Sequence, residues 1–398
     1  MLAALYYLNQ AMTADSIQNE LQAIRNASLY RSLRRVENDQ GPTLMLDGRE
    51  VINFSSNNYL GIANHPALAE AAKKAIDRFG CGSGASRLIS GNMTLHEELE
   101  TKLAAFKGSE AALVFNSGFQ ANTGILSTLA GDGDAILSDA LNHASIIDGC
   151  RLSRAKTIVY AHGALHQLEE GLKQVTSARR KVIVTESIFS MDGDEAPLGG
   201  IVELAEKYDA MVMVDEAHAT GIFGTNGAGV VAKLGLAERV AVQMGTLGKA
   251  LGGFGAYIAG SSALRELLIN RCRSFIFTTS LPPAVMAMAI AAIDLVEREP
   301  ERREILWKNC RALQEGLKNL GFSPGESQSP IMPIIIGDVT KCMQFSERLL
   351  EKSVFVQGIR PPTVPPGTSR LRITLMATHT RDHIDRAIEA FRQVKEKS

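Results

Sequence analysis

Short apolar runs alternate with amphipathic stretches through the middle of the chain. Continuous apolar strands separated by helices are typical of a mainly parallel sheet that is covered on both faces. The pattern therefore predicts an α/β domain whose strands begin near residue 111. The runs are AALVF (111–115), DAILSD (134–139), TIVYA (157–161), KVIVTES (181–187), AMVMVDEAH (210–218), VAVQMG (240–245) and GAYIAG (255–260).

The stretches between these runs have helical spacing, for example Gly118–Leu129, Ile146–Arg154 and Leu198–Lys207. Polar residues stand at the carboxyl ends of several runs. In open α/β sheets, ligands bind outside the carboxyl ends of the strands. We therefore expect the functional site near the strand-end residues Asp139, Glu186, Asp215 and Thr246.

The two ends of the chain have a different pattern. Residues 1–50 resemble an arm, in which a helical pattern over 16–35 stops before Gly41-Pro42. After residue 285 helices alternate with a few short strands, and a Pro-rich loop follows at 359–370. We expect an N-terminal arm, a large domain over 51–285 and a small α/β domain over 286–398.

Composition narrows the class of protein. The 398 residues include 42 Lys+Arg and 43 Asp+Glu, and the net charge of -1 argues against broad electrostatic capture of nucleic acid or anionic membrane. No run reaches the roughly 20 apolar residues that a membrane helix needs. The five cysteines are odd in number and lack a Cys-x-x-Cys pair, which argues against a disulfide framework or a zinc site and favours the cytoplasm.

Lys249 is the strongest candidate for chemistry, within MGTLGKALGGFGAY (244–257). Most isolated lysines are solvated surface residues. Small and apolar neighbours would remove hydration from this amine, lower its pKa and make it a nucleophile. A Walker A motif is excluded, because Ala250 follows the lysine where Ser or Thr is needed.

Asp215 and His218 lie in MVMVDEAHATGIFG (211–224), directly after an apolar run. An Asp that caps the next turn is the common reading of this pattern. The alternative is a carboxylate that faces a cationic ring nitrogen, which would keep a pyridinium protonated and electron-withdrawing. Asp, His and Lys on neighbouring strand ends suit pyridoxal phosphate (PLP) better than a metal, which requires more ligands at closer spacing.

Two weaker signals depend on this first group. Gly118 and Phe119 follow a strand and begin a helix, so their N–H groups could hold a phosphate, although a plain helix start has the same letters. His143 could stack on a cofactor ring or act as a structural hydrogen-bonding group. The Gly-rich segment GCGSGASRLISG (80–91) follows a helix, which excludes a dinucleotide-binding turn and suggests a loop at a subunit interface.

Taken together, these segments resemble the α-oxoamine synthases, PLP enzymes of the aminotransferase type (fold type I), over about residues 20–395. The resemblance implies a PLP-dependent α/β fold with a mainly parallel large domain, a smaller C-terminal domain and a homodimer. One departure is Asn58, where an Asp is frequent. The motifs are NFSSNNYLG (53–61), GSGASRLISG (82–91), SDALNHASIIDG (138–149), TESIFSMDGD (185–194), VDEAHATGIFG (214–224) and GTLGKALGG (245–253).

The resemblance also implies roles for individual residues. Lys249 matches the lysine that forms a Schiff base with PLP, Asp215 the partner of the ring nitrogen and His218 the partner of the ring hydroxyl. His143 matches the residue stacked on the ring, and Arg360 the arginine that pairs with the amino-acid carboxylate. Further cofactor positions are Gly118, Phe119, Ser190 and Thr246, with Thr278 supplied by the other subunit; further substrate positions are Arg31, Asn57 and Thr363.

The loop IRPPTVPPGTSR (359–370) resembles the branch of the family that condenses L-alanine with a pimeloyl thioester, carried by coenzyme A or acyl carrier protein, in biotin biosynthesis. The alternative is another member, such as glycine C-acetyltransferase or serine palmitoyltransferase. A nucleotide-binding dehydrogenase would need a Gly-x-Gly-x-x-Gly turn after the first strand, and the chain has none. An inactive relative would be expected to lack the lysine or the aspartate, and both are present.

Overall fold

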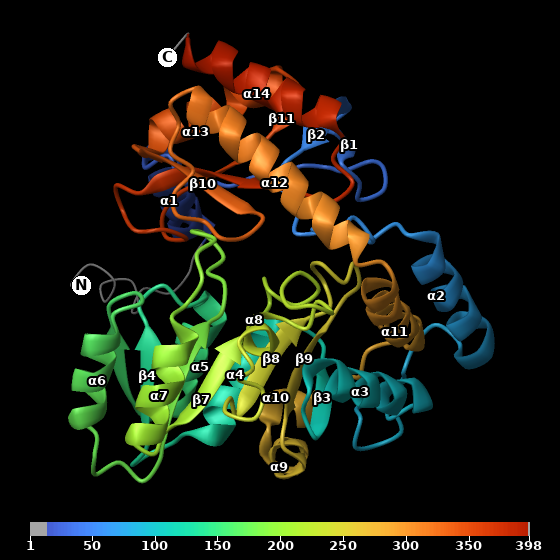
Figure 1. Ribbon diagram of the computed structural model, residues 1–398, viewed down its shortest axis with the longest axis vertical. Helices are drawn as coiled ribbons and strands as arrows, with labels where there is room; N and C mark the ends of the chain where they lie inside the picture. The colour runs from blue at the N-terminus through green and yellow to red at the C-terminus, as the bar shows by residue number, and fades with distance from the viewer. Residues whose placement is uncertain (1–13, 397–398) are drawn as a thin grey trace.

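The computed structural model describes residues 14–396 and is built around a seven-stranded sheet (Figure 1). β9 runs antiparallel to both of its neighbours, and the other neighbouring pairs are parallel. The predicted mainly parallel sheet is therefore confirmed. The strands, in spatial order, are β3 (Ala111–Phe115), β9 (Ala256–Gly260), β8 (Val242–Thr246), β7 (Met211–Asp215), β6 (Lys181–Glu186), β4 (Ala135–Asp139) and β5 (Lys156–Tyr160).

Helices cover both faces of this sheet. Alternate residues of one strand enter different apolar clusters: Leu113 packs on the side of α4 and α5, whereas Val114 packs on the side of α3 and α7. This alternation explains why the strands are apolar without interruption. The helices of this unit are α2 (Pro66–Phe79), α3 (Thr94–Lys107), α4 (Gly118–Leu129), α5 (Ala144–Ser153), α6 (Leu165–Lys173), α7 (Leu198–Lys207), α8 (Val230–Lys233), α9 (Ser262–Arg271), α10 (Arg273–Ile276) and α11 (Pro283–Arg298).

A second unit lies above the carboxyl ends of the parallel strands (Figure 1). It holds two three-stranded sheets: β10 (Ile331–Gly337), β13 (Ser369–Thr374) and β12 (Gln357–Ile359) in one, and β1 (Thr43–Leu46), β2 (Arg49–Asn53) and β11 (Val354–Phe355) in the other. The helices α12 (Glu301–Asn319), α13 (Val339–Glu351) and α14 (Arg381–Lys395) cover them. The hairpin β1–β2 joins this unit because β2 pairs in parallel with β11.

The N-terminal helix is shorter than the pattern over 16–35 predicts. α1 spans Ala14–Asn26 and ends in a Schellman motif. Ser28 has a left-handed backbone (φ 59°), its N–H donates to Arg25 O, and the N–H of Leu29 donates to Ile24 O, both at 3.0 Å. The charged stretch that follows is therefore not helical. The first 13 residues of the expected arm lie outside the described residues.

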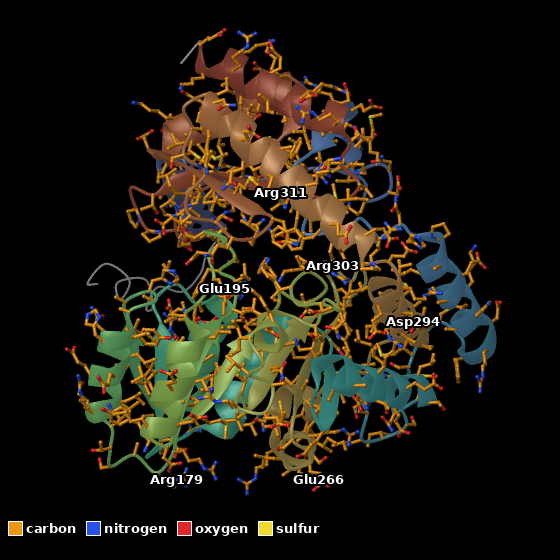
Figure 2. The ribbon with its side chains drawn as sticks, in the orientation of Figure 1. Arg179, Glu195, Glu266, Asp294, Arg303 and Arg311 are labelled. Atoms are coloured by element: carbon orange, nitrogen blue, oxygen red, sulfur yellow. The ribbon has the colours of Figure 1, made fainter. Side chains whose placement is uncertain are left out.

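Side chains also join the two units. Arg303, on α12, donates to the carbonyl oxygens of Val296 and Thr225, each at 2.7 Å, and Figure 2 places it between the units. Within residues 14–396, no helix combines the length and the apolar character needed to cross a membrane.

Candidate active site

A cavity of about 230 Å³ lies where the two units meet, at the carboxyl ends of the parallel strands. Loops after β6, β7 and β8 supply one wall, and β12 and β13 supply the opposite wall. The sheet position is the one that the strand-end residues predict. The lining residues are Ser55, Asn57, His143, Ser190, Met191, His218, Lys249, Gln357, Ile359 and Arg372.

Lys249 enters this cavity from the tight turn after β8. The turn is closed by Gly252 N–H, which donates to Lys249 O at 2.9 Å, and Gly252 has a positive φ of 63°. A side chain at Gly252 would collide with the backbone of Ala63, so glycine allows the turn to pack closely. Loss of hydration lowers the pKa of Lys249 below its usual value, against the opposing effect of the Asp215 charge. This is the property expected of a nucleophilic amine.

Asp215 ends β7 and is buried beneath the cavity. Its carboxylate accepts hydrogen bonds from Asn122 Nδ2 (2.8 Å) and from the N–H of Ala217 (2.9 Å). Among the described residues, these amides are its hydrogen-bond donors and no ion pair reaches it. A buried carboxylate with neutral donors can still accept a cationic N–H group, and the protonated ring nitrogen of PLP fits that requirement.

Glu186 ends β6 and stands beside Asp215 in the sheet register. Its Oε1 is buried without a hydrogen-bond partner. Burial, and then the charge of Asp215, raise the pKa of Glu186 well above its ordinary value, which favours the neutral form of this carboxyl.

His143 and His218 both line the cavity. His143 is the N-cap of α5, where its Nδ1 accepts from the N–H of Ser145 at 3.2 Å. Burial lowers the pKa of His218 well below its usual value, so its ring is neutral. His218 Nδ1 lies 2.7 Å from the hydroxyl of Tyr59, which donates to Asn57 Oδ1 at 3.2 Å. In the tautomer that satisfies both contacts, Nδ1 carries the proton and Nε2 is left as an acceptor, which suits a ring hydroxyl.

The N-terminus of α4 can hold the phosphate. The helix begins at Gly118, and the hydroxyl of its N-cap Ser117 accepts from the N–H of Gln120 at 3.2 Å. The first N–H groups of a helix, here those of Gly118 and Phe119, have no acceptor within the helix and attract anions. Thr246, at the end of β8, donates to Gly255 O at 2.9 Å. The free N–H groups at the start of α4, together with the acceptors Asp215 and His218, therefore fit PLP.

Thr278 lies elsewhere within this chain. Its hydroxyl accepts from Asn116 Nδ2 at 3.2 Å, and it lines a small cavity with Arg87 and His96 rather than the one with Lys249.

Arg360 of the C-terminal loop and Arg372 of β13 face different surfaces. Arg372, on β13, lines the cavity with Lys249, whereas Arg360 donates to Tyr30 O and lies 3.1 Å from Met343 Sδ. Arg360 borders a neighbouring groove of about 570 Å³ together with Arg31 and Thr363, and Arg31 donates to Thr363 Oγ1 at 3.3 Å. Cavity and groove share the lining residues Gln357 and Ile359, so they are adjacent.

Sequence reasoning missed Arg372, together with Asn122 and Tyr59, which contact Asp215 and His218. The available signal was the pattern SRLRITL (369–375), in which two arginines alternate with apolar residues on a strand. An arginine at a buried strand position requires a specific partner.

A lysine amine, a buried carboxylate and two imidazoles at the carboxyl ends of a mainly parallel sheet, beside a helix N-terminus, define a PLP-dependent enzyme of fold type I. The model of the family described as aminotransferase class I and II matches residues 49–391. The chain belongs to this family and, within it, to the α-oxoamine synthases.

Curated relatives and solved structures agree with this placement. The 8-amino-7-oxononanoate synthases of Geotalea daltonii and Geobacter sulfurreducens are each 53% identical, over 95% of this chain and 97% of their own. Serine palmitoyltransferase from Sphingomonas wittichii superposes with a TM-score of 0.92 at 35% identity, over 97% of this chain and 99% of that one. An 8-amino-7-oxononanoate synthase from Francisella tularensis gives 0.75 at 29% identity, over 87% and 98%.

Proposed function

We propose that this protein is a PLP-dependent C-acyltransferase that condenses L-alanine with a pimeloyl thioester. The products are 8-amino-7-oxononanoate, CO2 and the free thiol, a step of biotin biosynthesis. The observation that carries the proposal is the cavity in which Lys249, His143 and Arg372 converge above Asp215, in a chain about half identical to 8-amino-7-oxononanoate synthases. Serine palmitoyltransferases share the fold at the lower identity of 35%.

Bound PLP supplies an electron sink for negative charge at the α-carbon of the amino acid. Asp215 would hold the ring nitrogen, Gly118 and Phe119 the phosphate, and His218 the ring hydroxyl. Lys249, whose pKa is lowered by burial, carries a neutral amine more readily than a surface lysine does. That amine would hold PLP covalently and, once free, would take the α-proton of the amino acid at Nζ.

Arg372 would bind the amino-acid carboxylate, because its guanidinium is in the cavity and a planar fork matches a carboxylate. Arg360, Arg31 and Thr363 border the adjoining groove, which suits the acyl thioester. Arg360 keeps the carboxylate role that the family resemblance implies only if its side chain turns from Tyr30 toward the cavity. The thioester carrier is coenzyme A or acyl carrier protein.

We also propose a cytoplasmic homodimer. Large apolar side chains are exposed around the phosphate end of the site, with Phe277 at 71%, Ile89 at 81% and Phe254 at 56%. Their segments are neighbours, since Ser280 N–H donates to Ala85 O at 3.0 Å. A second copy would cover these side chains and bring its Thr278 to this phosphate site. The five cysteines are free, which fits a reducing compartment.

The experiment is a thiol-release assay with three amino acids and a series of acyl thioesters. We expect the highest kcat/KM for L-alanine with the pimeloyl thioester, and no release by Lys249→Ala, which also loses the borohydride-stable pyridoxyl adduct. A higher kcat/KM for glycine with acetyl, or for L-serine with palmitoyl thioester, would overturn the assignment in favour of another α-oxoamine synthase.

A further inference from the structure

The loop 189–194 follows β6, and one side of it lines the active site. Its other sides are held by two groups of charged side chains, which we call the first and second anchor. Ser190 and Met191 line the cavity with Lys249. The loop is closed on itself, because Gly193 N–H donates to Phe189 O at 2.8 Å and Phe189 N–H donates to Asp194 O at 3.1 Å. Its two carboxylates, those of Asp192 and Asp194, are each bound by a cation from a different part of the chain.

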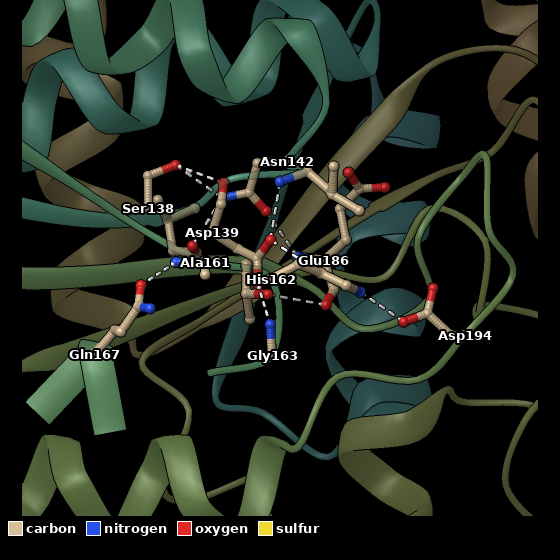
Figure 3. A network of polar contacts seen from close by, with 12 residues as sticks. Ser138, Asp139, Asn142, Ala161, His162, Gly163, Gln167, Glu186 and Asp194 are labelled. Carbon is tan, nitrogen blue, oxygen red and sulfur yellow. Dashed lines mark hydrogen bonds and ion pairs between the residues drawn. The ribbon is translucent and has the colours of Figure 1, made fainter. Parts of the chain in front are cut away.

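The first anchor is His162, which follows β5 at the edge of the large sheet (Figure 3). Its Nε2 lies 2.7 Å from Asp194 Oδ2 and its Nδ1 lies 3.0 Å from Asp139 Oδ1. Asp139 is itself fixed at the end of β4, where it accepts from the N–H groups of Leu141 (2.9 Å) and Gly163 (3.0 Å). The chain of contacts therefore runs from the sheet through an imidazole to the loop.

His162 is positively charged in this arrangement. Both ring nitrogens face carboxylate oxygens, and only an imidazolium donates from both. Asp139 and Asp194 raise the pKa of His162 to about 10. Phe189 packs against the imidazole in a T-shaped arrangement, with ring centroids 4.3 Å apart, so the imidazole is held by packing as well as by charge. Near neutral pH the anchor is therefore an ion pair.

The second anchor comes from β13 of the upper unit. Arg370 and Arg372 are two residues apart on this strand, so their side chains share one face. Arg370 forms an ion pair with Asp192, and Arg372 Nε donates to Ser190 O at 2.6 Å. Both arginines are buried, which makes accurate pairing necessary. The direction of the Arg372 guanidinium is thus set by Ser190 O of the loop, together with Asn57 Oδ1, which accepts from Arg372 Nη2 at 3.2 Å.

We propose that the loop 189–194 is an ionic latch between the two units, and that His162 and Arg370 are positioning residues that aim Arg372 at the carboxylate of the amino-acid substrate. One end of the latch is His162 with Asp194, and the other is Arg370 with Asp192. The affinity of a guanidinium for a carboxylate falls when the planar group is turned slightly away from the carboxylate oxygens. Loosening either end therefore weakens the binding of the amino acid more than it changes the chemistry that follows.

The identity of the ligand in this inference rests on the proposed function, whereas the latch itself does not. The test therefore uses two measurements on Asp192→Asn, His162→Gln and the double variant. The first is hydrogen exchange of the loop amides in the protein without amino acid. The second is the dissociation constant of L-alanine, read from the absorbance of the PLP-loaded protein.

We expect faster exchange in the loop for each single variant, and L-alanine binding weaker by about tenfold, the effect of losing one partly buried charged contact. We expect PLP affinity and kcat at saturating L-alanine within about twofold of wild type. We expect the double variant to bind L-alanine as tightly as the weaker-binding single variant does, because release of either end frees the same loop. Arg370→Lys, which retains the charge, should restore part of the affinity relative to Arg370→Met.

The matched control is Glu195→Gln, which removes the 2.8 Å ion pair with Lys233 one residue beyond the loop (Figure 2). We expect wild-type exchange and binding from it. The latch is refuted if Asp192→Asn and His162→Gln change neither measurement more than Glu195→Gln does, or if their effects on L-alanine binding add in full. Unchanged absorbance of the wild type with L-alanine would count against the proposed function, and the exchange measurement would still decide the latch.

Discussion

Arg372 and Arg360 are the two candidates for the arginine that binds the carboxylate of the amino-acid substrate. Arg372 lies in the cavity with Lys249, and Arg360 lies against Tyr30 and Met343. We expect Arg372→Lys to raise the KM for L-alanine by tenfold or more, since lysine cannot form the planar fork. We expect Arg360→Lys to change the KM for the thioester instead, by about twofold to fivefold. Steady-state kinetics with each substrate varied in turn would check this, and a larger L-alanine effect for Arg360→Lys would reverse the two roles.

At the same scale, the sequence predicted the residues that carry a motif and missed those that a motif does not mark. Lys249, His143, His218, Asn57 and Ser190 converge on one cavity. Asn122 and Tyr59 were missed because an amide in a helix and a phenol in a loop have ordinary structural readings. Their relation to Asp215 and His218 depends on contacts across 93 and 159 positions of sequence, which local patterns do not encode.

Among the elements, α4 joins fold and function most directly, because its first turn is both a capped helix end and the expected phosphate site. Ser117→Ala removes the cap, and we expect the free energy of unfolding to fall by about 1 kcal/mol. We also expect PLP affinity to fall severalfold, since the first turn of α4 frays.

Ser261→Ala is the control. Ser261 caps α9 in the same way, through Leu264 N–H at 3.1 Å, and α9 lies far from the junction of the two units in Figure 1. Chemical denaturation and PLP titration would check both variants. Equal loss of PLP affinity in the two would contradict the role of α4.

Element boundaries followed from sequence where local chemistry sets them. Gly118–Leu129 and Leu198–Lys207 agree with the structure at both ends. The reversed direction of β9 and the pairing of β2 with β11 had no local signal. Strand direction and pairing are decided by which distant surfaces are buried together, so periodicity alone left them open.

At the scale of the whole molecule, the exposed apolar residues near the phosphate end of the site predict that one chain is an incomplete enzyme. Phe277 and Ile89 are largely exposed, and Phe277 directly precedes Thr278, which lies away from the chain's own cavity. Burying one such side chain contributes about 1.5–3 kcal/mol, so Phe277→Asp combined with Ile89→Asp should weaken dimerisation by at least about 100-fold. Because the monomer would lack the partner's Thr278, we expect PLP affinity to fall as the dimer is lost, with the dimer followed by its mass in sedimentation experiments.

Val159→Asp is the control, since Val159 is 63% exposed on β5, the sheet edge opposite β3. A double variant that stays dimeric, or a wild type that is monomeric and fully active, would refute the shared site. Loss of the dimer in parallel with loss of PLP binding would show that each chain completes the PLP site of the other.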